Sequence, residues 1–406
     1  MAHPIDSRIY MSFTRQAIEP ATFEFFDYKR YTFSLGLKSP DGAWLSGHTA
    51  SRFEPKVERI VVSGEMERQA SLAHDKIETV LSAAGYSWNN VVKINDYVSV
   101  AGLGTYELIA DIRSARLGSH LPATTCVVVD RLLRPAALIE IEVVASAHPA
   151  QVFELGRTDR KIPRAAATRI GDLVYVSGQV GVDESGEIPD KGDLVAQTTR
   201  AYRNIELALQ KAGVSTKQIV KTVDYVHWSV RSDYRKTGRV RREVLDEPYP
   251  AATGIVVNRL PHPDALIQID AFAHDGDRTA VNPGWDRYEK LTYNPAIRAG
   301  DYLYLSGQFS MNPVTQEPEH IDDIVAQTRN VYTNLFKVMD AAGLDEKAMV
   351  KTVEYVVGTG LPEYRKTAVV REELFSAPYP AATGCVIPQL LWPGMLIEVD
   401  SVARFS

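Results

Sequence analysis

Three stretches of sequence decide the fold: Pro122-Ala123-Thr124-Thr125, Pro250-Ala251-Ala252-Thr253 and Pro380-Ala381-Ala382-Thr383. Each opens an apolar run, and 18 residues after each proline stands an acid or amide of a second β-rich run, at Glu140, Gln268 and Glu398. A lysine precedes each proline by 29 residues, at Lys93, Lys221 and Lys351. A stretch of about 70 residues keeps its register in all three copies, so one structural unit is repeated three times.

The bulk composition is that of a soluble globular protein, with 45% hydrophobic and 24% charged residues. The chain of 406 residues is too long for one ordinary core, and three units of roughly 120 residues fit the usual domain size. The net charge of -6 argues against a nucleic-acid or anionic-membrane partner, because both need a basic surface. Two cysteines in different copies give no disulfide framework, and neither a signal core nor a run of 18 apolar residues is present, so we expect a cytoplasmic protein.

The pattern within each copy predicts an α+β unit with two helices on one face of a sheet. In the second copy, strands are expected at 172–179, 219–226, 254–257 and 265–271, and helices at 193–211 and 232–245. Gly213 suits the end of the first helix, since glycine adopts the left-handed conformation without a Cβ penalty. We expect an N-terminal extension at 1–29 and three domains at 30–150, 151–282 and 283–406.

These motifs, in this order and spacing, resemble the reactive intermediate deaminase family (Rid, formerly YjgF-like). The resemblance rests on Ser-Gly-Gln after a strand, Ala-Gly at a helix end, Val-Lys-Thr in a strand, Pro-Ala before an apolar strand and a final Ile-Glu-Ile-Glu. Members are single units that form homotrimers with small-molecule sites between neighbours. The resemblance therefore implies three tandem Rid-like (chorismate-mutase-like) domains that form a pseudo-trimer within one chain.

The resemblance also implies site residues. The family glutamate that activates water matches Glu140 and Glu398, while Gln268 in the second copy cannot act as a base. The remaining matches are the strand-end glycines Gly47, Gly178 and Gly307, the following Gln179, Gln308 and His48, and the single matches Cys126 and Tyr293. His48 is the third catalytic candidate, because a histidine titrates near neutral pH.

One family feature is missing from every copy. The arginine that holds the substrate carboxylate is replaced by Thr124, Ala252 and Ala382. We expect the hydroxyls of Thr125 and Thr383 to take its place for a less acidic substrate, and Thr124 and Thr253 are further candidates for substrate binding.

Several of these residues also have simpler, purely structural interpretations. Glu140 and Glu398 could be solvent-facing acids of edge strands, and His48 could mark a site that has lost its function. Tyr97, Tyr225 and Tyr355 recur at one offset and are expected to pack between units, whereas a surface or packing role is expected for His227. Arg235, Lys236, Arg239, Arg241 and Arg242 are expected to form a basic helix face in the second copy only.

The leading hypothesis is hydrolysis of a C–N or C–O bond in a small metabolite by glutamate-activated water, with no cofactor and no metal. The alternatives are a chorismatase-like enol-ether hydrolase and a non-catalytic metabolite-binding or scaffold protein. A higher oligomer is possible. Because fused copies mutate independently, one or two working sites are expected among three.

Overall fold

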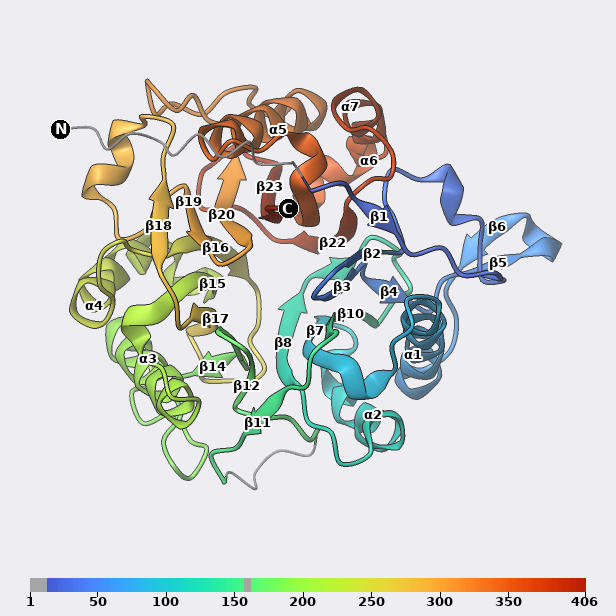
Figure 1. Cartoon of the computed structure of the whole chain (residues 1–406), viewed down its shortest axis with the longest axis horizontal. Coiled ribbons are helices and arrows are strands. Elements are labelled where there is room, and N and C mark those ends of the chain that lie inside the picture. The colour runs from blue at the N-terminus through green and yellow to red at the C-terminus, as the bar shows by residue number, and fades with distance from the viewer. Residues whose placement is uncertain (1–12, 157–161) are drawn as a thin grey trace.

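The computed structural model describes residues 13–156 and 162–406. Three similar units surround a common axis, with their sheets toward the axis and their helices outside (Figure 1). This arrangement confirms the expected α+β fold of three tandem domains. Among the described residues, no helix combines the length and the apolar character needed to cross a membrane.

Each unit is built on a sheet of one strand order. The first sheet runs β1 (Gln16–Ala17), β2 (Gly36–Ser39), β3 (Gly42–Leu45), β10 (Ile139–Ser146), β7 (Val91–Ser99) and β8 (Ala123–Val129), with β4 (His48–Thr49) also paired to β10. The second runs β11 (Gln151–Phe153), β12 (Ala167–Ile170), β13 (Leu173–Val176), β17 (Ile267–His274), β15 (Ile219–His227) and β16 (Ala251–Val257), with β14 (Gln179–Val180) on β17. The third runs β18 (Arg278–Val281), β19 (Ala296–Ala299), β20 (Tyr302–Phe309), β23 (Ile397–Arg404), β21 (Met349–Val357) and β22 (Ala381–Ile387). In each sheet the last two strands are parallel, so a helix connects them.

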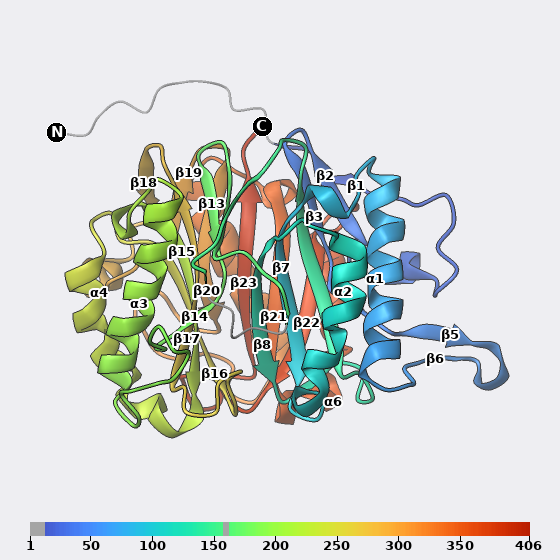
Figure 2. The same cartoon turned by 90° about the horizontal axis from the view of Figure 1, so that it is seen from below.

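The helices cover the outer face of each sheet (Figure 2). They are α1 (Met66–Ala83) and α2 (Ala110–Leu117), then α3 (Leu194–Lys211) and α4 (Gly238–Val244), then α5 (Ile324–Ala341), α6 (Leu361–Tyr364) and α7 (Thr367–Leu374). A buried glutamine explains part of the repeated spacing: in α3, the Gln197 side chain accepts a hydrogen bond from the Leu266 amide just before β17. Gln69 and Gln327 make the same bond to Leu138 and Leu396. The repeated glutamine therefore ties each long helix to the last strand of its sheet.

Three details differ from the expectations. The expected helix at 232–245 is a 3-10 segment, Trp228–Thr237, followed by the short α4. The strand β18 pairs within the third sheet although it precedes the expected boundary at 282, and β1 pairs within the first sheet although it lies in the expected extension. These edge strands could not be assigned because they are short and carry no repeated motif. Residues 1–12 of that extension lie outside the described residues.

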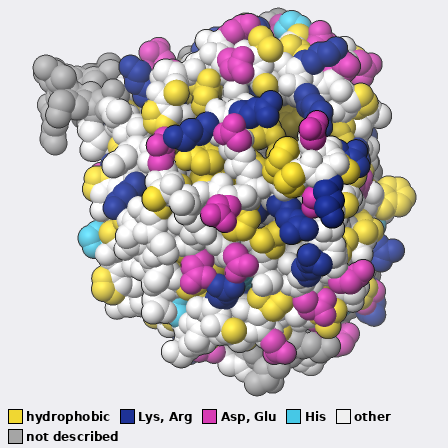
Figure 3. Space-filling view, turned by 90° about the vertical axis from the view of Figure 1, so that its right-hand side faces the viewer, with side chains coloured by type: hydrophobic (Ala, Val, Ile, Leu, Met, Phe, Trp, Pro, Cys, Tyr) yellow, Lys and Arg dark blue, Asp and Glu magenta, His cyan; other side chains and the backbone are white. Residues whose placement is uncertain are grey.

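The first unit has two additions. A hairpin of β5 (Arg52–Glu54) and β6 (Arg59–Val61) projects from the body and accounts for the longer loop of this copy (Figure 2). On the face that carries it, acidic, basic and hydrophobic side chains are interspersed (Figure 3). The other addition is β9 (Arg131–Leu132), which crosses over and pairs with β22 of the third sheet.

The units meet through buried side chains at the axis. Tyr97, Tyr225 and Tyr355 are all at most 3% exposed, and the hydroxyls of Tyr225 and Tyr355 lie 3.2 Å apart. The expected packing role of these tyrosines is therefore confirmed. The three domain boundaries are named here 1/2, 2/3 and 3/1 after the units that form them.

Candidate active site

Each boundary is held by the same buried ion pair. Lys93 of the first unit pairs with Asp270 of the second at 2.5 Å, and Lys221 of the second pairs with Asp400 of the third at 2.6 Å. Lys351 closes the ring through Glu142 of the first unit at 2.7 Å. Because one residue of each pair comes from each neighbour, the repeated lysines join the units.

A threonine contacts each of these ion pairs, and an ion pair together with its threonine is called a lock below. Thr125 accepts from Lys93, donates to Asp270 at 3.0 Å and also accepts from the Gly178 amide. Thr253 likewise donates to Asp400 and accepts from the Gly307 amide, and Thr383 donates to Glu142 and accepts from Lys351. Thr124 turns its hydroxyl to the Pro122 carbonyl. The hydroxyls of Thr125, Thr253 and Thr383 therefore help to join the units, and a role of the threonines in substrate binding stays a prediction.

The two family glutamates are both buried, and their charged neighbours differ: Lys351, Glu142 and Lys76 lie near Glu140, and Asp400 lies near Glu398. Glu140 and Glu398 are 7% and 5% exposed on the central strands β10 and β23, so the solvent-facing interpretation is wrong. Burial raises the pKa of each carboxyl group to about 8. Within the described residues, neither carboxylate takes part in a hydrogen bond or an ion pair. A carboxyl group that is almost buried and has a strongly raised pKa is typical of functional sites, which marks both positions as candidates for function.

The strand-end glycines let these carboxyl groups approach the backbone. A Cβ atom at Gly307 would overlap the Glu398 carboxylate, and one at Gly47 would overlap the Glu140 carboxylate. Each glutamate therefore lies against the turn that resembles the water-holding turn of the family.

The middle copy is different. Gln268 donates to the Cys126 carbonyl at 2.8 Å, so the amide closes boundary 1/2 with a hydrogen bond. Cys126 is buried, and burial raises the pKa of its thiol to about 12, which leaves it a packing residue. Gln179 donates to the Ser177 carbonyl at 2.8 Å. Boundary 1/2 thus gathers Gly178, Gln179, Gln268, Thr125 and Cys126, with an amide at the position that holds a glutamate at the other two boundaries.

Boundary 2/3 holds the most complete set of polar groups. Gln308 donates to the Tyr288 hydroxyl at 3.3 Å, and the Tyr288 and Tyr293 rings meet edge to face at 5.5 Å. Glu398 lies near both phenols, since its charge helps to raise the pKa of each. The structure therefore brings Glu398, Gly307, Gln308 and Tyr293 together.

The sequence motifs did not reveal Arg287, which also belongs to this group. Its guanidinium lies 5.3 Å from the Tyr288 ring and donates to the Met311 thioether, a weak acceptor. Its Nε is buried without a hydrogen-bond partner in the part of the chain that the structure describes. Arg287 also lies within hydrogen-bonding reach of Tyr293, and it lowers the pKa of that phenol against the effect of burial. Arg287 lies before the sequence motifs that the third copy shares with the family. Only its position beside Tyr293 in the folded structure therefore shows that it belongs to the site.

Boundary 3/1 gathers Glu140, Gly47 and His48 with Lys76. His48 is buried, and burial, with Lys76 and Lys351 nearby, lowers its pKa to about 3. It is therefore a neutral imidazole, and the expectation of titration near neutral pH is wrong. Lys76 donates to the Thr49 and Ser51 carbonyls, just as Asn204 and Asn334 at the same helix position bind backbone carbonyls.

Comparisons with known proteins agree with this architecture. The family model described as Endoribonuclease L-PSP matches residues 29–147, 163–275 and 288–405. A RutC family protein of Pyrococcus abyssi is 37% identical over 113 residues, which cover 28% of this chain and 86% of the relative. The 3-aminoacrylate deaminase RutC of Acinetobacter baylyi is 35% identical over 112 residues, 28% of this chain and 86% of the relative. Each curated relative thus corresponds to one unit of the chain.

A solved chorismatase structure matches several units at once. It covers 78% of this chain and 93% of its own, with a TM-score of 0.52 and 15% identity, which shows the fold alone. The three family matches, the single-unit relatives and the repeated boundary locks lead to one conclusion. The chain belongs to the endoribonuclease L-PSP (Rid/YjgF) family, as a fusion of three tandem copies.

Proposed function

We propose that boundary 2/3 hydrolyses the C–N bond of a small enamine or imine that carries a carboxylate. The observation that carries the proposal is Glu398, which is 5% exposed, lies against the Gly307 backbone and makes no side-chain hydrogen bond to another described residue. A relative that matches one unit is named a 3-aminoacrylate deaminase, which supports this reaction class.

The chemistry assigned to Glu398 is that of a general base. In the imine form of the substrate, water adds to the carbon of the C=N bond while Glu398 takes one of its protons. The proton then passes to nitrogen, which gives a carbinolamine. Glu398 next takes the proton of the new hydroxyl group and returns it to the amine nitrogen, so that the C–N bond breaks, ammonia leaves and a carbonyl remains. The raised pKa of Glu398, about 8, suits a group that accepts and returns a proton near neutral pH.

Arg287 is proposed to hold the substrate carboxylate. A guanidinium binds a carboxylate through two parallel hydrogen bonds, and among the described residues Arg287 contacts the Met311 thioether and the Tyr293 phenol but forms no ion pair with an acid. Arg287, which comes from a different segment, would thus bind the substrate carboxylate in place of the arginine that the family carries after Pro-Ala.

Ammonia release from freshly generated 3-aminoacrylate tests the proposal. Glu398→Gln should lower kcat/KM by about 10²- to 10⁴-fold, the usual contribution of a positioned base. Arg287→Gln should mainly raise KM, because it removes binding common to substrate and transition state. Glu140→Gln is the matched control, since it makes the same change at boundary 3/1. Full activity of the Glu398→Gln variant would exclude this site, and loss in Glu140→Gln alone would move the reaction to boundary 3/1.

The enol-ether alternative has weaker support, since the likeness to chorismatase shows the fold alone. That chemistry needs cations for two carboxylates, whereas of the two arginines near Tyr293 one, Arg241, is already paired with Asp224, which leaves Arg287.

A further inference from the structure

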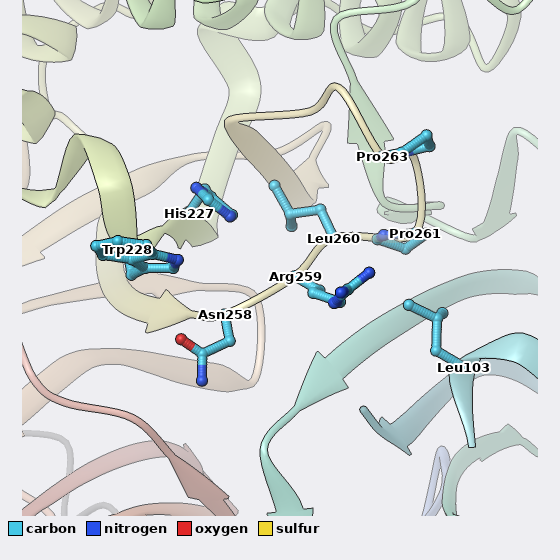
Figure 4. A pocket seen from close by; sticks show the side chains of 8 residues that line it. All are labelled: Leu103, His227, Trp228, Asn258, Arg259, Leu260, Pro261 and Pro263. Atoms are coloured by element: carbon cyan, nitrogen blue, oxygen red, sulfur yellow. The ribbon is translucent and has the colours of Figure 1, made fainter. Parts of the chain in front are cut away.

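A cavity of about 340 Å³ lies at boundary 1/2, at the end of β15. Its walls come from two units, with Leu103 on the side of the first unit (Figure 4). The second unit supplies His227 and Trp228 from the end of β15, and the loop after β16 supplies Asn258, Arg259, Leu260, Pro261 and Pro263. A volume of this size falls within the range of small-molecule sites, about 300–1,000 Å³.

The repeat provides an internal comparison for this cavity. The positions of His227 and Trp228 hold Ser99 and Val100 in the first copy, and Val357 and Gly358 in the third. At boundary 2/3, the counterpart of Leu103 is Arg231. Its guanidinium donates hydrogen bonds across the boundary to the Gln389 side chain and the Leu390 carbonyl. At boundary 3/1, the loop equivalent to Arg259–Leu260 forms β9 and pairs with β22. Neither of these contacts is made at boundary 1/2, where the cavity lies.

The walls combine an aromatic face with a cation. Trp228 is 53% exposed, and its ring lies against the His227 ring at 5.9 Å. His227 Nδ1 lies 2.7 Å from the Ser229 hydroxyl, and burial lowers the pKa of His227, so the imidazole is neutral and fixed. Arg259 forms no ion pair with an acidic side chain of the described residues. The Asn258 amide donates to Asp130 of the first unit at 2.6 Å.

We propose that this cavity binds a small planar anion of the aryl carboxylate class. Its ring would stack on Trp228 and its carboxylate would pair with Arg259, because an indole face and a guanidinium are the groups that recognise these two parts. The side chains that line this cavity include no carboxylate that could act as a base, so the site is proposed to bind its ligand without hydrolysis.

Calorimetric titration with 2-naphthoate tests the site. The wild-type protein should bind, and Arg259→Gln and Trp228→Leu should each weaken binding by about tenfold or more, which corresponds to about 1.4 kcal/mol. Arg242→Gln is the matched control, because Arg242 is an exposed arginine of the same unit outside the cavity. Cyclohexanecarboxylate, which has charge but no flat ring, should bind more weakly than 2-naphthoate.

Binding of 2-naphthoate in this cavity can be tested separately from the hydrolysis proposed at boundary 2/3. Glu398→Gln should abolish turnover and leave 2-naphthoate binding unchanged. Absence of binding to the wild-type protein, or equal affinity in the Arg259 and Trp228 variants, would overturn the proposal. Loss of binding in Glu398→Gln would also overturn it, since the ligand would then occupy boundary 2/3.

Discussion

At the scale of single residues, Glu398 sets the pH dependence of the proposed reaction. The base acts only when its carboxyl group is ionised, and burial raises the pKa of that group to about 8. We therefore expect kcat/KM to rise about tenfold per pH unit below pH 8 and to level off above it. A pH profile of ammonia release between pH 5 and 10 measures this. A profile that is flat above pH 5 would contradict an unpartnered buried base.

The same group makes stability depend on pH. Its pKa is raised from 4.5 in the unfolded chain to about 8 in the folded protein, so folding favours the neutral acid. The folded state therefore loses stability as pH rises from about 4.5 to about 8. Glu398→Gln removes this loss, and the Tm of the variant should fall less than that of the wild type between pH 5 and 8. A Tm difference that stays constant across this range would contradict the shifted pKa.

The sequence predicted some of these residues and missed others for a physical reason. The glutamates and glycines were found because motif and spacing fix their place in one unit. The role of the threonines in joining the units was missed because their partners, such as Asp270 for Thr125, come from another unit. His48 was expected to titrate because a sequence shows neither its burial nor the nearby lysines. Arg287 was missed because only the fold brings it to Tyr293.

At the scale of elements, the locks between β15 and β23 should dominate the stability of boundary 2/3. Lys221 and Asp400 are both buried, and removal of one partner leaves the other charge without compensation. Lys221→Met is expected to destabilise the protein by about 3–5 kcal/mol. Lys217→Met is the control, since Lys217 pairs with Asp246 at the exposed surface and contributes little. Chemical denaturation of both variants measures the difference, and equal effects would show that the lock is not stabilising.

The 3-10 segment Trp228–Thr237 and α4 differ from the basic helix face that the sequence predicted. Arg241 is 5% exposed and bonds Asp224 and Tyr234, in the same arrangement as Arg113 with Asp96 in the first unit. The exposed arginines of this helical segment, such as Arg239, thus form a smaller surface than the sequence suggested. The sequence shows only that several basic residues lie close together. The buried Asp224 on β15 determines that Arg241 is the one whose side chain turns into the protein.

At the scale of the whole molecule, fusion explains why the boundaries differ. Each boundary combines the lysine and threonine of one unit with the acid of the next, so this part must be kept in every copy. The groups around the glutamate position are free to change. Boundary 2/3 keeps Glu398 beside Gln308, boundary 3/1 keeps Glu140 beside His48, and boundary 1/2 has Gln268. The repeated residues are therefore the structural ones, and the differing residues identify the sites.

This arrangement predicts how one unit behaves alone. The middle unit contains both halves of a lock, Lys221 with Thr253 on one side and Asp270 on the other. A head-to-tail contact of this kind closes into a ring when the rotation permits, and the fused chain closes after three units. Residues 150–276 expressed alone should therefore assemble as a trimer, which analytical ultracentrifugation would measure. Lys221→Met should prevent assembly of this fragment, because it removes the lysine from every boundary at once. A stable monomeric fragment would show that the buried charges at the boundaries do not require a neighbour.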